Sequence, residues 1–410
     1  MDFNDSPEEA VYRTAARAWL SEHAPPGLRE RRVREIETRE GLGAARRWQT
    51  QKAEAGYACI TWPAEWGGPA GSPIESVIFA EEEAKVAPPD NPFRIGLTMS
   101  VPTVLHFGRA PAIERFAARA MRGDDVWCQL FSEPAGGSDL AAARTTAEPA
   151  PDESGDWIVN GQKVWTTGAH LADFGLLLCR TDRAALKHQG LTMFWIDLKA
   201  PGVTIRPIHE MDGSAGFNEV FLDEVRLSDA QRLGPVGAGW KAAIHALMNE
   251  RLAADQSGMG WRDFLELAQR VETSPGQAAI TDRAVREQLA DYFVALEGLR
   301  HTRNRSLTAL SRGQTPGPEN SIIKLVRARQ MLEMANAAVD MLGPYGVIDD
   351  EQFSGETQII HGSLFWAPGL RIAGGTDEVL RNIIAERVLG LPGDVRVDKD
   401  VPFREIPSGR

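Results

Sequence analysis

The sequence has few cysteines, few aromatic residues and no excess of positive charge. Its 410 residues include only three cysteines, Cys59, Cys128 and Cys179, whose wide spacing fits neither a zinc site nor a disulfide framework. Lys and Arg number 45 against 57 for Asp and Glu, so the formal net charge of −12 has the wrong sign for wrapping nucleic acid or anionic lipid. We therefore predict reduced cysteines, a cytoplasmic location and no nucleic-acid partner.

Signals for export, membrane insertion and common hydrolytic chemistry are also missing. The stretch Met1–Asp5 is acidic rather than basic, and no apolar run follows it, so we expect no signal peptide. No window approaches about 18 uninterrupted apolar residues, so we expect no membrane span. The sequence has no Walker A, His-Glu-x-x-His or Gly-x-Ser-x-Gly motif, which argues against the commonest ATPases, zinc proteases and serine hydrolases.

The residues that are present predict a large globular protein with a helical first third. Hydrophobic residues make up 43% of the chain and charged residues 25%, as in ordinary globular proteins. At about 150 residues per domain, the length predicts two or three domains. Ser6-Pro7-Glu8-Glu9 has the pattern of a helix start, with Ser6 as cap and Glu9 completing a capping box. Ala- and Glu-rich helical segments continue to about residue 123.

A β-rich region follows, and then helices return. Asn160-Gly161 lies between two runs of β-branched and aromatic residues, which predicts a hairpin with a type I′ turn. Further strands are expected over 176–179, 193–198, 203–208 and 219–227. Apolar residues from Leu325 to Leu342 repeat every three or four positions, predicting a helix that ends at Gly343-Pro344. Another helix is expected over 376–389, capped by Thr376.

Three separated segments carry candidate binding chemistry. In the first, 131–139, paired glycines expose backbone N–H groups beside two hydroxyls, although any tight loop uses the same residues. In the second, 160–168, Trp165 precedes two threonines at a strand end, and its indole forms either a ligand platform or part of the core. In the third, 374–378, two glycines lead into a helix start that either receives a polar ligand edge or simply caps the helix.

Taken together and in this order, the three segments resemble the motifs of the acyl-CoA dehydrogenase family of flavoproteins. The resemblance covers almost the whole chain, because four further segments also agree: Asn218–Arg226, Gly239–Lys241, Asn249–Arg251 and Arg381–Arg387. It implies an N-terminal α-helical domain (1–124), a middle antiparallel β-barrel (125–235), a C-terminal four-helix bundle (236–392) and a tail (393–410) that folds over the surface or stays mobile. It also implies a homotetramer or heterotetramer, or a dimer.

The resemblance implies FAD as the cofactor and assigns residues to it. Those expected to line the flavin and its phosphates or cover its ring are Phe131, Ser132, Gly137, Ser138, Trp165, Thr166 and Thr167. Gly375, Thr376 and Glu378 are expected to hold the cofactor at the helix start. The substrate is expected to be an acyl-CoA or another acyl thioester, and the electron acceptor an electron-transfer flavoprotein.

Forming a trans-2-enoyl thioester requires a base that removes the α-proton. Many family members carry this Glu where the present chain has Gly374, but others carry it before an Arg on a different helix, as in Glu250-Arg251. We therefore predict Glu250 as the base, with its pKa raised by burial above about 4.3. The backbone N–H of Gly374 is expected to polarise the thioester carbonyl. Ser138 and Arg251 are expected to contact the substrate.

Two segments depart from the family pattern. Family members often have Arg-x-Gln-Phe-Gly where this chain reads Glu272–Gly276, and a Gln and Gly-Gly where it has Asp340 and Gly343-Pro344. By resemblance both serve the neighbouring subunit's FAD, which favours a heterotetramer like the actinobacterial steroid dehydrogenases. Three alternatives stay open at this point: an acyl-CoA oxidase or a flavin monooxygenase on the same fold, or a non-catalytic subunit of a heteromeric dehydrogenase.

Overall fold

The computed structural model describes residues 5–25, 39–86, 91–250, 258–311, 317–318, 320–348, 354–395, 398 and 400–406. Contacts divide the chain into two compact units. The first, here called the β unit, comprises Asp5–Ala253 and Asp394–Arg410, and the second, the helical unit, comprises Met1–Asn4 and Ala254–Gly393. Over the described residues, the chain therefore passes from the β unit into the helical unit and returns. The domain boundaries expected from the sequence stay a prediction.

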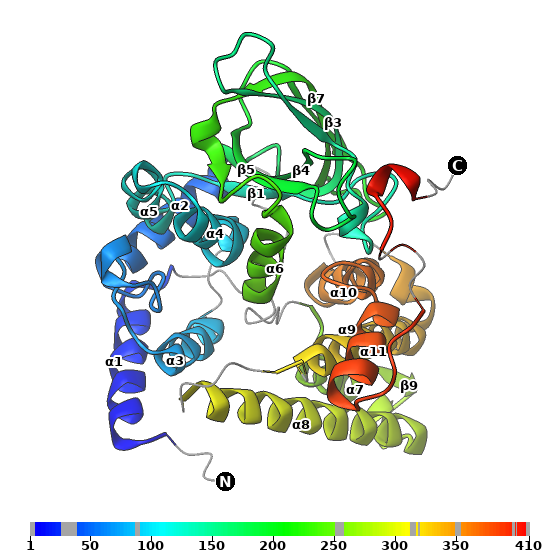
Figure 1. Ribbon diagram of the computed structural model, residues 1–410. Helices are drawn as coiled ribbons and strands as arrows, with labels where there is room; N and C mark the ends of the chain where they lie inside the picture. Colours follow the sequence, from blue (N-terminus) through cyan, green and yellow to red (C-terminus); the bar gives the residue numbers. More distant parts are fainter. Residues whose placement is uncertain are drawn as a thin grey trace. The chain divides into compact units, whose positions relative to one another are not determined.

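The first part of the β unit is helical, as predicted (Figure 1). The Ser6 hydroxyl accepts from the Glu9 backbone N–H at 3.2 Å, and the Glu9 carboxylate accepts from the Ser6 N–H at 2.7 Å, which confirms the capping box. This box satisfies donors that the helix itself leaves free. The longer helices are α1 (Pro7–His23), α2 (Arg39–Glu54), α3 (Pro73–Glu83), α4 (Val101–Phe107) and α5 (Ala110–Arg122). A π-helical turn, η5 (Gly96–Ser100), leads into α4.

One eight-stranded sheet forms the middle of the β unit. Its order is β6-β7-β3-β2-β4-β5-β8, with β1 on β4, and it is antiparallel except where β4 pairs with β1 and β2. The strands are β1 (Trp127–Leu130), β2 (Thr146–Pro149), β3 (Trp157–Thr167), β4 (Phe174–Arg180), β5 (Leu191–Asp197), β6 (Val203–Ile208), β7 (Phe217–Leu227) and β8 (Arg232–Leu233). The predicted runs 176–179, 203–208 and 219–227 lie within β4, β6 and β7, and 193–198 extends one residue beyond β5.

The hairpin predicted at Asn160-Gly161 is wrong. Both residues lie inside the continuous strand β3, and the runs on either side pair with β7 instead of with each other. Gly161 has φ +156°, and a Cβ there would lie 2.5 Å from Thr145 Oγ1. The glycine thus permits a close approach of Thr145 at a shift in the β3–β7 register.

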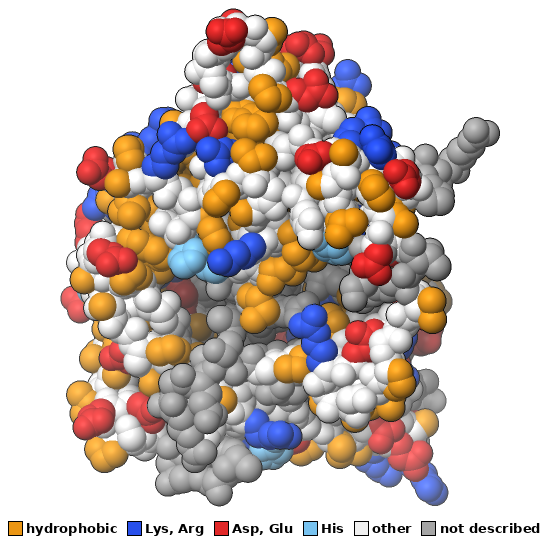
Figure 2. Space-filling model, in the orientation of Figure 1, with side chains coloured by type: hydrophobic (Ala, Val, Ile, Leu, Met, Phe, Trp, Pro, Cys, Tyr) orange, Lys and Arg blue, Asp and Glu red, His pale blue; other side chains and the backbone are white. Residues whose placement is uncertain are grey.

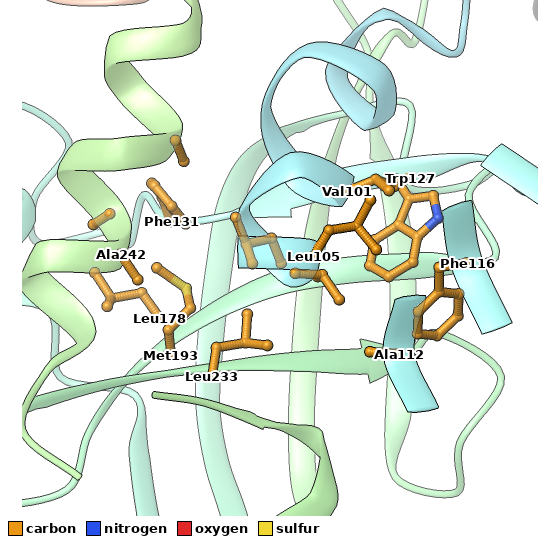
Figure 3. Close-up of a cluster of buried hydrophobic side chains, with 14 of the residues drawn as sticks. Val101, Leu105, Ala112, Phe116, Trp127, Phe131, Leu178, Met193, Leu233 and Ala242 are labelled. Atoms are coloured by element: carbon orange, nitrogen blue, oxygen red, sulfur yellow. The ribbon is translucent and has the colours of Figure 1, made fainter. Parts of the chain in front are cut away.

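Both faces of the central strand β4 are buried. Leu176 and Leu178 join a cluster that includes α4, α5 and the helix α6 (Gly239–Glu250), while Leu177 and Cys179 join the cluster on the other face. Figure 3 shows Leu178 and Met193 of the sheet close to Ala242 of α6. Packing against α4 and the sheet therefore fixes the first turns of α6, the helix that ends at the predicted base.

The cysteines are free, as predicted, and two of them belong to this core. Burial raises the pKa of Cys128 and of Cys179 to about 12. Because the thiolate is the reactive form, neither residue is an active nucleophile.

The helical unit has its own core, which includes Phe264, Met334 and Ile360. Its elements are α7 (Trp261–Arg270), a β9–β10 hairpin (Glu272–Ser274 and Gln277–Ala278), α8 (Arg283–Ser311), α9 (Asn320–Leu342), η9 (Gly343–Val347), α10 (Ser354–Ile372) and α11 (Asp377–Ile383). Helix α9 ends at Leu342, directly before the predicted Gly343-Pro344, where the 3-10 helix η9 begins, and α11 continues as a π-helical turn to Val388. Within the described residues, no helix is both long and apolar enough to cross a membrane.

Charged side chains of both signs lie on the face of the molecule drawn in Figure 2. On the face drawn in Figure 2, red acidic and blue basic side chains are interspersed. The net charge of −12 is therefore not gathered into one acidic patch on that face.

Candidate functional site

The first motif forms a tight turn after β1. The Glu133 N–H donates to the Gly136 carbonyl at 3.0 Å, and the Gly136 N–H donates to the Glu133 carbonyl at 2.9 Å. Phe131 is buried beneath the turn, whereas Gly137 and Ser138 are exposed. The turn thus exposes two of the four residues of this motif that are predicted to contact the cofactor, Gly137 and Ser138, whereas Phe131 lies in the core and Ser132 is half-buried.

A buried ion pair joins this turn to β3. The Glu133 carboxylate lies 2.7 Å from the Lys163 ammonium, which also donates to the Phe131 carbonyl at 3.1 Å. The carboxylate accepts further bonds from the backbone N–H groups of Arg144 and Thr145 at 2.6 and 2.9 Å. Burial acts to raise the pKa of Glu133, but the Lys163 charge and these bonds hold it below its ordinary value. Sequence analysis missed this pair, since Glu133 and Lys163 are distant in the chain.

The second motif lies beside the first at the end of β3. The Val164 N–H donates to the Ser132 carbonyl at 2.9 Å, so the two segments share a backbone hydrogen bond. Trp165 has φ +58°, at a shift of the β3–β7 register, and is 59% exposed. This left-handed conformation costs a non-glycine residue about 1–2 kcal/mol. Strain of this kind is common at functional sites, and the exposed indole excludes the core alternative for Trp165.

Thr166, the next residue, carries an unsatisfied hydroxyl. The residue is 1% exposed, and its Oγ1 finds no hydrogen-bond partner among the described residues. The backbone is held separately, because the Thr166 carbonyl accepts from Asn218 Nδ2 at 3.0 Å. A buried hydroxyl without a partner costs free energy, but its burial also keeps this atom out of reach of a ligand. The next residue, Thr167, is exposed at the end of β3, so its hydroxyl is the one that a ligand beside Trp165 can reach.

The third motif lies in the helical unit, where it forms the start of α11. Gly374 and Gly375 have φ +63° and +98°, conformations that favour glycine. The Thr376 hydroxyl accepts from the Val379 N–H at 3.2 Å, confirming the cap, and the Lys324 ammonium donates to the Gly375 carbonyl. Glu378 is exposed, and hydrogen bonds from its own N–H and from Thr376 lower its pKa. The helix start therefore keeps a carboxylate ionised at its positive end.

The predicted base and its neighbour fall at the limit of the described chain. Glu250 is the last residue of α6 and its side chain lies outside the described residues, as does the whole of Arg251. One turn earlier, His245 Nδ1 lies 3.2 Å from the Thr103 hydroxyl of α4. This contact adds to the apolar packing that holds α6 in the β unit.

Comparison with known proteins identifies the family. Residues 6–124, 128–228 and 237–389 match the N-terminal, middle and C-terminal domains of acyl-CoA dehydrogenases. The chain is 35% identical over 398 residues to the acyl-CoA dehydrogenase IpdE1 of Mycobacterium tuberculosis, covering 94% of this chain and 98% of that protein. It is 38% identical over 349 residues to FadE34 of the same organism, covering 84% of this chain but 46% of that protein. The chain belongs to the acyl-CoA dehydrogenase family, whose members are flavoprotein oxidoreductases of lipid metabolism.

Solved structures agree with this assignment. The ChsE4–ChsE5 complex from Mycobacterium tuberculosis contains a chain with a TM-score of 0.77 and 26% identity, covering 96% of this chain and 100% of that one. The Tcur3481–Tcur3483 steroid ACAD gives a TM-score of 0.78 at 23% identity with the same coverage, which shows the shared fold. The predicted architecture of a helical N-terminal region, a β-rich middle region and a helical C-terminal region is thus confirmed.

Proposed function

We propose that this chain catalyses FAD-dependent α,β-dehydrogenation of an acyl-CoA to a trans-2-enoyl-CoA. The observation that carries the proposal is the strained and exposed Trp165, followed by the exposed Thr167, within a family motif. The Thr167 hydroxyl can bond the polar edge of a flavin ring, and the indole supplies a face on which a planar ring can lie.

The cofactor contacts proposed here are those that the three motifs predict. In the β unit, the proposed FAD contacts are Phe131, Ser132, Gly137, Ser138, Trp165, Thr166 and Thr167. In the helical unit, they are Gly375, Thr376 and Glu378. When bound, FAD would supply the hydride acceptor for the substrate β-carbon. The chain's own residues then need to hold the cofactor, polarise the thioester and accept the α-proton.

Glu250 is proposed as the base, because Gly374 cannot provide a carboxylate. The proton leaves the substrate α-carbon for the Glu250 carboxylate as the β-hydrogen leaves with its electron pair, so the substrate loses two hydrogens overall. The enolate charge that develops on the thioester oxygen requires a donor. The Gly374 N–H is proposed for this role, and Ser138 and Arg251 are proposed to contact the acyl-CoA.

The electron acceptor and the quaternary structure are proposed from the relatives. We propose that a soluble electron-transfer flavoprotein receives the electrons and that the chain acts in the cytoplasm. We further propose a hetero-oligomer, since two structural neighbours are described as pairs, ChsE4–ChsE5 and Tcur3481–Tcur3483. The departures at Glu272–Gly276 and Asp340 support this proposal, because they alter segments expected to serve a neighbouring subunit.

Absorbance spectroscopy of the purified protein tests the function directly. The expected result is a yellow protein whose flavin band bleaches on anaerobic titration with an acyl-CoA from a panel of short, branched, long and steroidal thioesters. A colourless protein that takes up no added FAD would contradict the proposal and favour a non-catalytic subunit. Fast reoxidation of the bleached protein by oxygen would instead indicate an oxidase.

A further inference from the structure

The C-terminal end of the chain folds back onto the β unit, where it contacts the loop between β4 and β5. The Phe403 N–H donates to the Ala185 carbonyl and the Arg404 N–H to the Arg183 carbonyl, each at 2.9 Å. Pro402 forms a β-bridge with Leu186. The Phe403 ring is 4% exposed. The segment comprising Asp398 and residues 400–406, here called the C-terminal clasp, is therefore specifically docked.

Phe403 covers a buried cation. Arg180, at the end of β4, is 1% exposed, and its guanidinium carbon lies 3.7 Å from the centre of the Phe403 ring. The guanidinium donates to the carbonyls of Ala141, Ala143 and Lys187 at 2.5, 3.3 and 2.7 Å, and to no carboxylate of the described residues. Burial lowers the pKa of Arg180 to about 10. The ring face thus replaces water over a charge that lacks a hydrogen-bonded counter-ion.

Two of these carbonyls follow directly on the first binding motif. Ala141 and Ala143 belong to, or border, the short helix η6 (Leu140–Ala142), which begins after Asp139. The Asp139 carboxylate itself lies 2.6 Å from the Lys187 ammonium. That ammonium also bonds the Asp398 carboxylate of the clasp. Arg180 and Lys187, which hold the end of the motif loop, therefore each contact a clasp residue: Phe403 covers Arg180, and Asp398 pairs with Lys187.

Different side-chain contacts fix the two ends of the 131–139 loop. Glu133 and Lys163 hold the beginning, and Arg180 and Lys187 hold the end. Between them lie the exposed Gly137 and Ser138. Without the clasp, Arg180 would be opened to water and Lys187 would lose one of its two carboxylates, so the loop end would gain freedom to move.

We propose that the C-terminal clasp positions the 131–139 loop for FAD, so that clasp docking and FAD binding are energetically coupled. The identity of the ligand rests on the proposed function, whereas the coupling between clasp and loop rests on the contacts above. Coupling is reciprocal. Loss of the clasp weakens FAD binding, and bound FAD in turn holds the clasp more tightly.

The test compares FAD dissociation constants, measured by flavin fluorescence, for the full-length protein and four variants. Phe403→Ala removes the ring, and we expect its dissociation constant to rise about tenfold or more. Phe403→Tyr keeps an aromatic face, so its dissociation constant should be close to that of the unsubstituted protein. Val395→Ala, at a residue that is 86% exposed in the same tail, is the matched control and should change nothing. Asp398→Asn removes one carboxylate and should raise the constant by a smaller factor.

Hydrogen exchange supplies a second measurement. If the clasp only stabilised the fold, FAD would not change the exchange rates of the clasp amides. FAD should slow exchange of the Phe403 and Arg404 amides, which bond the Ala185 and Arg183 carbonyls. A Phe403→Ala protein that binds FAD within about twofold of the original chain would overturn the proposal. If Phe403→Ala does not fold, unchanged FAD binding by Asp398→Asn would overturn it instead.

The two proposals fail in distinguishable ways. If the original chain binds no FAD, the proposed function fails, and the coupling is then tested on the ligand-free proteins. Exchange of the amides over residues 139–145 should be faster in Phe403→Ala, or in Asp398→Asn, than in the original chain. Equal exchange rates over these residues would show that the clasp does not position the loop, whether or not the chain binds FAD.

Discussion

The carboxylate of Glu133 and the ammonium of Lys163 lie 2.7 Å apart in the core of the β unit, with side chains 7% and 0% exposed. This pair connects the turn of the first motif to the strand that ends in Trp165 and Thr166. Backbone groups add to the pair on both sides: the Arg144 and Thr145 N–H groups donate to the two carboxylate oxygens, and the Phe131 carbonyl accepts from the ammonium. The pair therefore sets the position of one binding segment relative to the other.

Removing one partner of this pair should be strongly destabilising. Lys163→Met leaves the Glu133 carboxylate buried without its counter-ion, and we expect the free energy of unfolding to fall by about 3–5 kcal/mol. Urea unfolding followed by circular dichroism measures this change. The matched control is Arg283→Met, which breaks an ion pair whose side chains are 87% and 63% exposed, and which should cost below about 1 kcal/mol. Equal losses in the two variants would contradict the role assigned to the pair.

The same pair predicts a pH dependence of stability. The pKa of Glu133 is below its ordinary value of 4.5 in the folded chain, so the unfolded state binds the proton more readily. Its contribution is therefore fully present above about pH 5 and is lost as pH falls from 4.5 through the folded pKa. Unfolding at a series of pH values should show the original chain losing stability relative to Glu133→Gln/Lys163→Met in acid. Parallel curves for the two proteins would refute this.

The Thr167 hydroxyl should matter to FAD, whereas the buried Thr166 hydroxyl should not. Thr166→Val keeps the side-chain shape and removes an atom that has no partner among the described residues, so the stability of the FAD-free protein should hold or rise and FAD binding should be unchanged. Thr167→Val, at an exposed residue, removes one proposed hydrogen bond to the cofactor and should weaken FAD binding by about tenfold. Thr192→Val is the control, because the Thr192 hydroxyl bonds Thr181 at 2.7 Å and the Gly237 N–H at 3.0 Å. That variant should lose stability instead; the opposite pattern would argue against a cofactor contact.

Local sequence signals predicted the elements but not the contacts between distant ones. The Ser6 capping box, the strand β6 and the end of α9 directly before Gly343 all depend on neighbouring residues, and all three are confirmed. The hairpin prediction at Asn160-Gly161 also used a local turn propensity, and it was wrong. The runs on both sides of these residues pair with β7, and this pairing depends on the whole sheet. Tertiary context overrides such propensities.

For the site as well, the sequence predicted local segments but not the contacts between distant residues. The motifs predicted Phe131, Ser132, Trp165 and Thr166 as site residues, and the structure brings the two segments that contain them together in the β unit. No local sequence pattern predicts the Glu133–Lys163 pair or the contact of Phe403 with Arg180. Each joins residues from separate elements, so only the folded chain reveals them.

Replacement of Glu250 tests the proposed base. Glu250→Gln removes the carboxylate that would accept the α-proton but keeps a side chain of similar size, so FAD binding should be retained. The rate of flavin bleaching by an acyl-CoA that reduces the original chain should fall by about 10²–10⁴-fold, the usual contribution of a positioned base. Stopped-flow absorbance under anaerobic conditions measures this rate. Glu114→Gln, at an exposed glutamate of α5, is the control and should bleach at the original rate. Undiminished bleaching by Glu250→Gln would exclude Glu250, and because Gly374 has no side chain, the base would then have to lie on another element.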